Sequence, residues 1–235
     1  YINSSTDGTV GGNLSVTATT GNITDTVALA VTGTSSFTTS ASNGTITLNT
    51  STNALTGAVT LSTTGSSGNA TIDNGTTALS IAASTIGGNL TVTAGDSITD
   101  SGVITVSGTA SFTTDTSDKL ITLNSQNAIT GQVTFDTTST GGDVTLDNGT
   151  TAISLGAIAS GAIGGDLTLL TDADQTISNA ITLGGSGAEL SITVDNANSL
   201  TIQAALTTNA GAITLSADDD VIFTVYCVLK HGYFH

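Results

Sequence analysis

One phrase of seven residues occurs three times in this chain and constrains its architecture more than any other feature. It reads Gly-Gly-Asn-Leu-Ser-Val-Thr from Gly11, Gly-Gly-Asn-Leu-Thr-Val-Thr from Gly87 and Gly-Gly-Asp-Leu-Thr-Leu-Leu from Gly164. The copies start about 75 residues apart. The segments 33–39 and 108–114 match in the same way. A fixed period of this kind is the sequence signature of a repeat protein.

The residues between these phrases favour strands over helices. Thr, Val and Ile are frequent, and no apolar stripe of useful length has the 3.6-residue period of a helix. Regularly placed aliphatic residues argue against a disordered Gly/Ser/Thr tract. Proline is absent, as expected where no strand lies at an edge that tolerates a missing N–H group. The chain is therefore predicted to be all-β.

Each repeat divides into three windows of about 25 residues, and each window carries three short apolar clusters between turn residues. The alternating side chains of such clusters predict short strands. Three strands per coil predict a right-handed parallel β-helix (a β-solenoid) with three coils per repeat. The alternative, one antiparallel β-sandwich per repeat, explains the 75-residue period but not the finer one. The predicted units are a lead-in at 1–10, repeats at 11–86 and 87–163, a degenerate repeat at 164–220, and a tail at 221–235.

The tail differs from the repeats in composition. It holds both histidines, the only cysteine and two of the five Phe residues. It is either a cap on the last coil or foreign sequence, and the residues alone do not separate these alternatives. Cys227, His231 and His235 lack a fourth partner for a metal site, so an incidental tail is preferred.

The charge of the chain restricts its partners. Eighteen acidic residues oppose Lys119 and Lys230, for a formal net charge of −16. This balance argues against nucleic acid, which requires Lys and Arg, and against an anionic membrane surface. One cysteine allows no internal disulfide, and no apolar run approaches the ~20 residues of a membrane-spanning helix. The chain begins at Tyr1 without a visible signal peptide, so it is expected to be a segment or a processed form of a longer polypeptide.

Candidate catalytic residues are scarce. Carbohydrate-active β-helix enzymes need clustered carboxylates with a basic partner, or paired carboxylates that flank the scissile bond. The repeats contain no Arg or His, and Lys119 is their only Lys. Asp73 and Asp147 occur in Asp-Asn-Gly, which is a turn signal. No catalytic residue is assigned, and the chain is predicted not to be an enzyme.

A calcium site is the only cofactor hypothesis that the residues raise. Asp218, Asp219 and Asp220 form the densest acidic run. A solvated turn is the preferred interpretation, and a Ca²⁺ contact is the weaker alternative. No other cofactor is expected.

Two recurring short patterns concern the surface. Thr-x-Thr words such as Thr45-Ile46-Thr47 and Thr91-Val92-Thr93 would suit ice if they stacked on one face, but they fall at different strand positions and predict an irregular face. Asn-x-Ser/Thr sequons are interpreted as turn asparagines, with glycosylation dependent on a suitable enzyme. They include Asn13, Asn22, Asn69, Asn74, Asn89 and Asn148.

The phrasing of residues 87–102 and 145–156 resembles the repeats of giant filamentous-haemagglutinin-like bacterial surface proteins. The resemblance covers about residues 11–220 and contains no invariant motif. It implies a secreted or surface-displayed β-helical stalk that works in adhesion or biofilm formation. The export domain, receptor-binding tip and membrane barrel of such proteins are not in this sequence, so no family binding residue can be assigned.

The resulting hypothesis is a non-enzymatic stalk segment at the bacterial cell surface or outside the cell. Its expected partners are further copies joined end to end or the rest of a longer polypeptide, with a host or matrix surface ligand as a further candidate. Nucleic acid binding and membrane insertion are not expected. The alternatives are a self-assembling extracellular filament subunit and a carbohydrate-active β-helix module.

Overall fold

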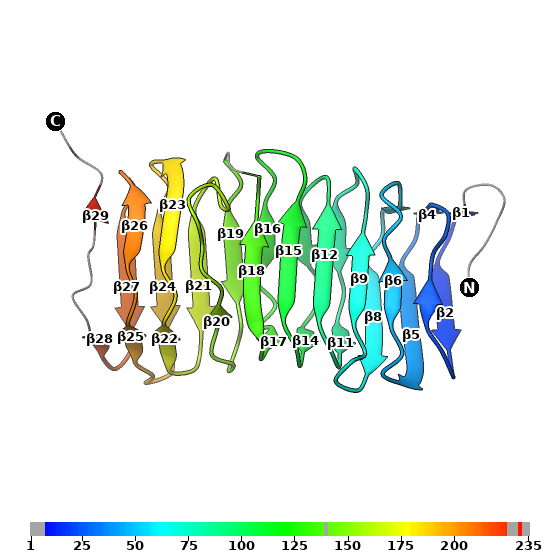
Figure 1. The fold of residues 1–235 in the computed structure, drawn as a ribbon, viewed down its shortest axis with the longest axis horizontal. Coiled ribbons are helices and arrows are strands. Elements are labelled where there is room, and N and C mark those ends of the chain that lie inside the picture. Colours follow the sequence, from blue (N-terminus) through cyan, green and yellow to red (C-terminus); the bar gives the residue numbers. More distant parts are fainter. Residues whose placement is uncertain (1–7, 139–140, 225–229, 232–235) are drawn as a thin grey trace.

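The computed structural model describes residues 8–138, 141–224 and 230–231. The described chain contains strands and turns but no helix, and every strand pairing within it is parallel. The strands stack along one axis into a β-solenoid of about 9 turns with about 23 residues per turn (Figure 1). The predicted all-β solenoid is confirmed, with a turn slightly shorter than the expected 25 residues. The antiparallel sandwich is excluded.

Three columns of strands form the sides of the solenoid, and we call them faces 1, 2 and 3 in the order in which the chain visits them. Face 1 is interrupted near Ile153, where no strand forms. It consists of β2 (Leu14–Ala18), β5 (Ser35–Ser42), β8 (Val59–Thr64), β11 (Ser84–Ile86), β14 (Ile104–Val106), β17 (Ala128–Ile129), β22 (Gln175–Ile177), β25 (Leu200–Ile202) and β28 (Val221–Phe223).

Face 2 follows face 1 in each turn and contains β3 (Ile23–Thr24), β6 (Ile46–Leu48), β9 (Ala70–Asp73), β12 (Leu90–Ala94), β15 (Ala110–Thr114), β18 (Gln132–Asp136), β20 (Ser154–Leu155), β23 (Ile181–Ser186), β26 (Leu206–Asn209) and β29 (Lys230–His231). Face 3 contains β1 (Gly8–Val10), β4 (Leu29–Val31), β7 (Ala54–Leu55), β10 (Leu79–Ile81), β13 (Ile98–Asp100), β16 (Ile121–Leu123), β19 (Val144–Asp147), β21 (Leu167–Thr171), β24 (Leu190–Val194) and β27 (Ile213–Ala217).

The core is one continuous column of aliphatic side chains between the three faces. Central residues of short strands alternate buried and half-buried, as in Ile121-Thr122-Leu123 of β16. The buried cluster runs without a break from Ile23 to Leu206. The rings of Phe112 and Phe135 stack inside it, with centroids 5.9 Å apart. A core one turn thick needs few aromatic residues, because each aliphatic side chain packs on its counterparts in the turns before and after.

The sequence repeat and the structural turn do not coincide. The repeated phrase places Leu14 in β2 on face 1, Leu90 in β12 on face 2 and Leu167 in β21 on face 3. Phe37 of β5 and Phe112 of β15 show the same displacement by one face. At about 23 residues per turn, a repeat of about 75 residues makes three turns and one further strand. The register therefore differs from the expected three whole coils per repeat, because apolar clusters mark strands but not the turn to which each belongs.

Part of the tail continues the stack. Val221–Phe223 pair with β25 and Lys230–His231 with β26. Val221, Ile222 and Phe223 are 39–47% exposed. Cys227 and His235 lie outside the described residues, so the choice between a cap and foreign sequence stays a prediction.

Candidate interaction surfaces

Four kinds of polar feature occur in the described residues: buried or half-buried carboxylates and amides, outward hydroxyl rows, corner carboxylates, and surface hollows. Asp25 and Asp100 each accept three hydrogen bonds from the following turn. Asp25 is 7% exposed and accepts hydrogen bonds from the N–H groups of Asn49 (3.1 Å) and Thr50 (3.4 Å). It also accepts one from Asn53 Nδ2 at 2.7 Å. Its oxygens are thus occupied in joining two turns.

The second repeat builds the same arrangement from Asp100 and Asn127. Asp100 accepts bonds from the N–H groups of Asn124 and Ser125 and, at 2.7 Å, from Asn127 Nδ2. In both copies the amide oxygen faces the preceding turn: Asn53 Oδ1 accepts from Leu29 N at 2.8 Å and Asn127 Oδ1 from Ile104 N at 2.7 Å. This recurrence indicates a structural role.

A second pair of buried asparagines replaces missing strand pairing. The Asn74 side chain is fully buried, accepts a bond from Leu55 N at 2.8 Å and donates one to Leu55 O at 3.1 Å. Asn148 does the same for Ile129, at 2.9 and 3.0 Å. Gln175 completes both backbone groups of Ile153 at 2.7 Å, where face 1 has no strand. These amides satisfy buried N–H and C=O groups that would otherwise lack partners.

The Asp-Asn-Gly words act as the sequence predicts. Asp73 Oδ1 accepts from Gly75 N, and Asp147 Oδ1 from Gly149 N, each at 2.9 Å. Both glycines have positive φ, 57° and 51°, which glycine adopts without strain because it has no Cβ atom. Asn74 and Asn148 were predicted to be turn residues and not buried linkers. The signal was present in the exact recurrence of Asp-Asn-Gly-Thr-Thr-Ala at 73–78 and 147–152.

The asparagines of the sequons differ in their exposure to solvent. Asn74 and Asn148 are inaccessible for glycosylation, because their amides are inside the solenoid. Asn13, Asn22 and Asn89 are exposed at corners, where each Oδ1 accepts a bond from an N–H group of the next turn. Asn69 is half-buried and accepts a bond from Asn89 N in the same way. The turn interpretation of these asparagines is confirmed.

Hydroxyl side chains form outward rows on the faces. Strand registers on face 3 align Ser80, Thr99, Thr122, Thr145, Thr168, Ser191 and Thr214 on consecutive turns. A row on face 2 contains Thr24, Thr47, Thr71, Thr91, Ser111 and Thr134. These rows align single hydroxyls and not whole Thr-x-Thr words. On face 2, Thr47, the second Thr of its word, aligns through Thr71 with Thr91, the first Thr of its word, so the words fall at different strand positions as predicted.

Carboxylates line the corners of the C-terminal turns. Asp143 Oδ1 accepts from Asp166 N at 2.9 Å, and Asp166 Oδ1 accepts from Glu189 N at 2.7 Å. These three exposed residues, which we call the acidic ladder, are spaced one strand apart. The carboxylates of Asp143 and Asp166 thus each accept a bond from the next turn, as the Asn69 and Asn89 side chains do elsewhere.

The predicted calcium residues lie in an exposed turn after β27. Asp218 Oδ2 accepts from Asn196 N at 2.9 Å, and Asp219 Oδ2 accepts from Ser199 Oγ at 3.0 Å. No group of three or more His, Cys, Asp or Glu side chains in the described ranges is arranged to hold a metal ion. The contacts favour the solvated turn, and the calcium site stays a prediction.

Lys119 has a carboxylate partner on the neighbouring turn. Its Nζ lies 3.0 Å from Asp96 Oδ1. The pKa of Asp96 is lowered, first by the hydrogen bond from the Ser97 backbone N–H and then by the bond from Lys119. The ion pair is partly exposed, so it gives little net stabilisation.

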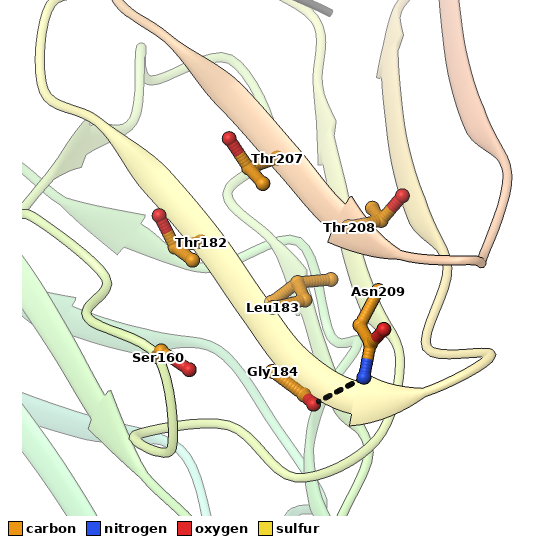
Figure 2. A pocket seen from close by; sticks show the side chains of 7 residues that line it. All are labelled: Ser160, Thr182, Leu183, Gly184, Thr207, Thr208 and Asn209. Carbon is orange, nitrogen blue, oxygen red and sulfur yellow. Dashed lines mark hydrogen bonds between the residues drawn. The ribbon is translucent and has the colours of Figure 1, made fainter. Parts of the chain in front are cut away.

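Two open hollows occur where the strand columns are irregular. The first, of about 250 Å³, lies over β23 and β26, next to the shift in register between Leu183 and Ser186. Figure 2 shows hydroxyls of Ser160, Thr182 and Thr207 around it and the bond from Asn209 Nδ2 to Gly184 O, 3.1 Å long. None of the residues that line it is charged.

The second hollow, of about 320 Å³, lies over the interruption in face 1. Its only carboxylate is Asp174, whose Oδ1 accepts from Ser199 N at 2.9 Å. The side chain of Gln175, which lines this hollow, is hydrogen-bonded to the backbone N–H and C=O of Ile153. Both hollows offer hydrogen-bonding groups, but neither pairs an acid with a base.

The comparison with protein families bears on this architecture. The sequence matches repeats of unknown function (DUF5649) at residues 3–62 and 67–136, which is more than half of the chain. The chain belongs to this family. The two DUF5649 matches lie in the part of the chain that builds β1 to β18. No curated protein and no solved structure matches the chain. The family supports the repeat architecture, while the resemblance to filamentous-haemagglutinin-like proteins stays a prediction.

No helix in the described part of the chain has the length and apolar character needed to cross a membrane.

Proposed function

We propose that this DUF5649 chain is a structural, non-enzymatic segment: a rigid spacer in a secreted or surface-displayed bacterial protein of the adhesin type. The single observation that carries the proposal is the unbroken core from Ile23 to Leu206 inside one stack of parallel strands. At about 4.8 Å per turn, about 9 turns make a rod of roughly 40–45 Å. Such a body holds two flanking parts at a fixed separation.

Stiffness follows from how the turns are joined. Backbone hydrogen bonds link each turn to the next, and the corner asparagines add side-chain bonds in the same direction. Asn74 and Asn148 bridge two of the places where strand pairing lapses, so no hinge is expected there. Bending the rod would open these bonds on one face together with the packing beneath them.

The surface supports a spacer better than a catalyst. Most of the carboxylates described above link turns or hold turn geometry, as Asp25 and Asp147 show. Lys119, the one cation whose side chain is described, is paired with Asp96. No observation favours the carbohydrate-active alternative, which needs a carboxylate pair or a carboxylate beside a base.

Rod length and stiffness test the proposal directly. Small-angle scattering of the chain should give the cross-section and length of a single rigid rod, unchanged between dilute and concentrated samples. A flexible profile would contradict the spacer, and a length that grows with concentration would favour the filament subunit. Surface display is tested separately, by adding a protease or an antibody against the chain to intact producing cells. Protection of the chain until the cells are lysed would contradict that part of the proposal.

A further inference from the structure

We infer that the sequence repeat is a module of three and one-third turns, so that successive repeats present the same side chains on successive faces of the rod. Ser15, Thr91 and Thr168 are equivalent in sequence and point outward from β2, β12 and β21, on faces 1, 2 and 3. A fourth copy would return to face 1. The surface pattern of a longer chain would then recur every three repeats, or ten turns.

The recurrence of a complete hydrogen-bond network at a different corner supports this inference. The Asp25–Asn53 network joins the end of face 2 to the start of face 3, whereas the Asp100–Asn127 network joins face 3 to face 1. The side-chain bond between the two residues is 2.7 Å in both copies. The local structure of a repeat therefore does not depend on the face that it occupies.

The buried amides show how the displacement is accommodated. The Asn74 side chain bonds to the backbone N–H and C=O of Leu55, where the sheet β1-β4-β7 ends on face 3. One repeat later, Asn148 completes the backbone of Ile129, at the end of β17 on face 1. Each repeat thus carries its own means of ending one column of strands, and that point moves round the rod with the repeat.

This geometry has a consequence for display. A binding feature encoded once per repeat would face three directions around a long stalk, so a partner could engage it from any side. If the repeat made whole turns, the same feature would form a single line along one face. The inference about geometry is independent of the proposed spacer role, whereas the use of display on a stalk rests on it.

Disulfide trapping in the full chain tests the module, in a Cys227→Ser background that removes the native thiol. Strand register makes Thr71 and Thr91 outward neighbours on face 2. Neighbouring strands lie about 4.8 Å apart, within the Cα range of about 4.4–6.8 Å that a disulfide tolerates. Thr71→Cys/Thr91→Cys should therefore crosslink on mild oxidation. If repeats made three whole turns, Thr91 would lie beside Thr60, because Thr60 continues the row of Ser15 and Ser36. The matched control is Thr60→Cys/Thr91→Cys, expected to crosslink at least about tenfold more slowly.

A second boundary gives an independent measurement. Thr145→Cys/Thr168→Cys should crosslink, because β19 and β21 pair in this register. Thr134→Cys/Thr168→Cys should not, although a whole-turn repeat would make these residues neighbours. Preferential crosslinking of the two control pairs would overturn the inference. These outcomes leave rod length untouched, so failure of the module and failure of the spacer proposal are distinguishable.

Discussion

At the scale of single residues, buried amides have a role in this fold that apolar side chains cannot fill. Turns of unequal length leave some backbone groups without a strand partner, and a side chain with both a donor and an acceptor can stand in for one. Asn74, Asn148 and Gln175 each bond to the N–H and the C=O of a single buried residue. Their burial is therefore a requirement of the fold.

Substitution of Asn74 by Ala should destabilise the chain strongly. The change leaves the N–H and C=O groups of buried Leu55 without partners, at about 1–3 kcal/mol for each unsatisfied group. We expect a loss of about 2–4 kcal/mol in the free energy of unfolding, measured by urea denaturation. Asn89→Ala is the matched control, because exposed Asn89 makes one side-chain bond to Thr109 N, and should cost less than about 1 kcal/mol. Equal effects of the two substitutions would contradict this role.

The ion pair between Lys119 and Asp96 should affect the titration of the Asp96 carboxyl group. The pKa of Asp96 is lower in the folded chain than in the unfolded chain. The small stabilisation that the Asp96 carboxylate contributes is therefore complete above its pKa in the unfolded chain, and it is lost as the pH falls through its pKa in the folded chain. Lys119→Met should raise the pKa of Asp96, yet leave it below its ordinary value because the Ser97 bond persists. NMR titration of the carboxyl carbon measures the pKa of Asp96 in the unsubstituted chain and in the Lys119→Met variant. An unchanged Asp96 titration would show that the ion pair does not form in solution.

At the scale of elements, the structural unit is the turn and not the sequence repeat. Strands of two to eight residues make up the faces, and most have too few hydrogen bonds to be stable alone. Their stability comes from stacking on the preceding and following turns, as in other repeat proteins. An insertion or deletion should therefore be tolerated when it preserves whole turns.

Deletion of residues 98–120 tests this rule. Ile98 and Ile121 are register partners, so the deletion removes one turn and places β16 on β10 with inward residues still facing inward. We expect a folded solenoid with cooperative thermal unfolding and a rod about 4.8 Å shorter. Deletion of residues 98–109 is the control: it removes about half a turn and should abolish the cooperative transition seen by circular dichroism. Comparable folding of the two deletions would show that turn phase does not matter.

At the scale of the whole molecule, repulsion between negative charges opposes the stability that core packing provides. The formal charge of −16 is unevenly placed, since Asp25 and Asp73 are the only acidic residues among positions 8–95. The C-terminal turns carry the acidic ladder of Asp143, Asp166 and Glu189. Like charges one strand apart repel, and salt screens that repulsion.

Stability should therefore rise with ionic strength. Between about 10 mM and 150 mM salt the Debye length shortens from about 30 Å to about 8 Å, and we expect the unfolding midpoint to increase by a few degrees. Asp166→Asn should reduce this salt dependence, because it removes the central charge of the ladder while its amide oxygen can still accept the bond from Glu189 N. Ser178→Asn, at an exposed position outside the ladder, is the control and should leave the salt dependence unchanged. A midpoint that falls with added salt would mean that repulsion does not limit stability.

The sequence by itself determined the class of fold. Period-two alternation in segments such as Ile121-Thr122-Leu123 decides which side chains face inward, and Asp-Asn-Gly decides where the chain turns. Both are local effects of backbone geometry, so they can be read without knowing what lies alongside. Three short strands per window then left the solenoid as the simplest way to bury every inward row.

Only the tertiary structure decided the phase of the repeat and the partners of the polar residues. Whether Leu90 lies over Leu14 or one face further on depends on the summed lengths of all the turns between them, and apolar spacing does not fix those lengths. Asp25 and Asn53 are 28 positions apart in sequence, and they meet only because one turn (β4, β5 and β6) and the corner before β7 separate them. The hydroxyl rows arise in the same way, since Thr residues from different sequence words align only when the turns have stacked. Local patterns constrain each strand, whereas register is a property of the whole stack.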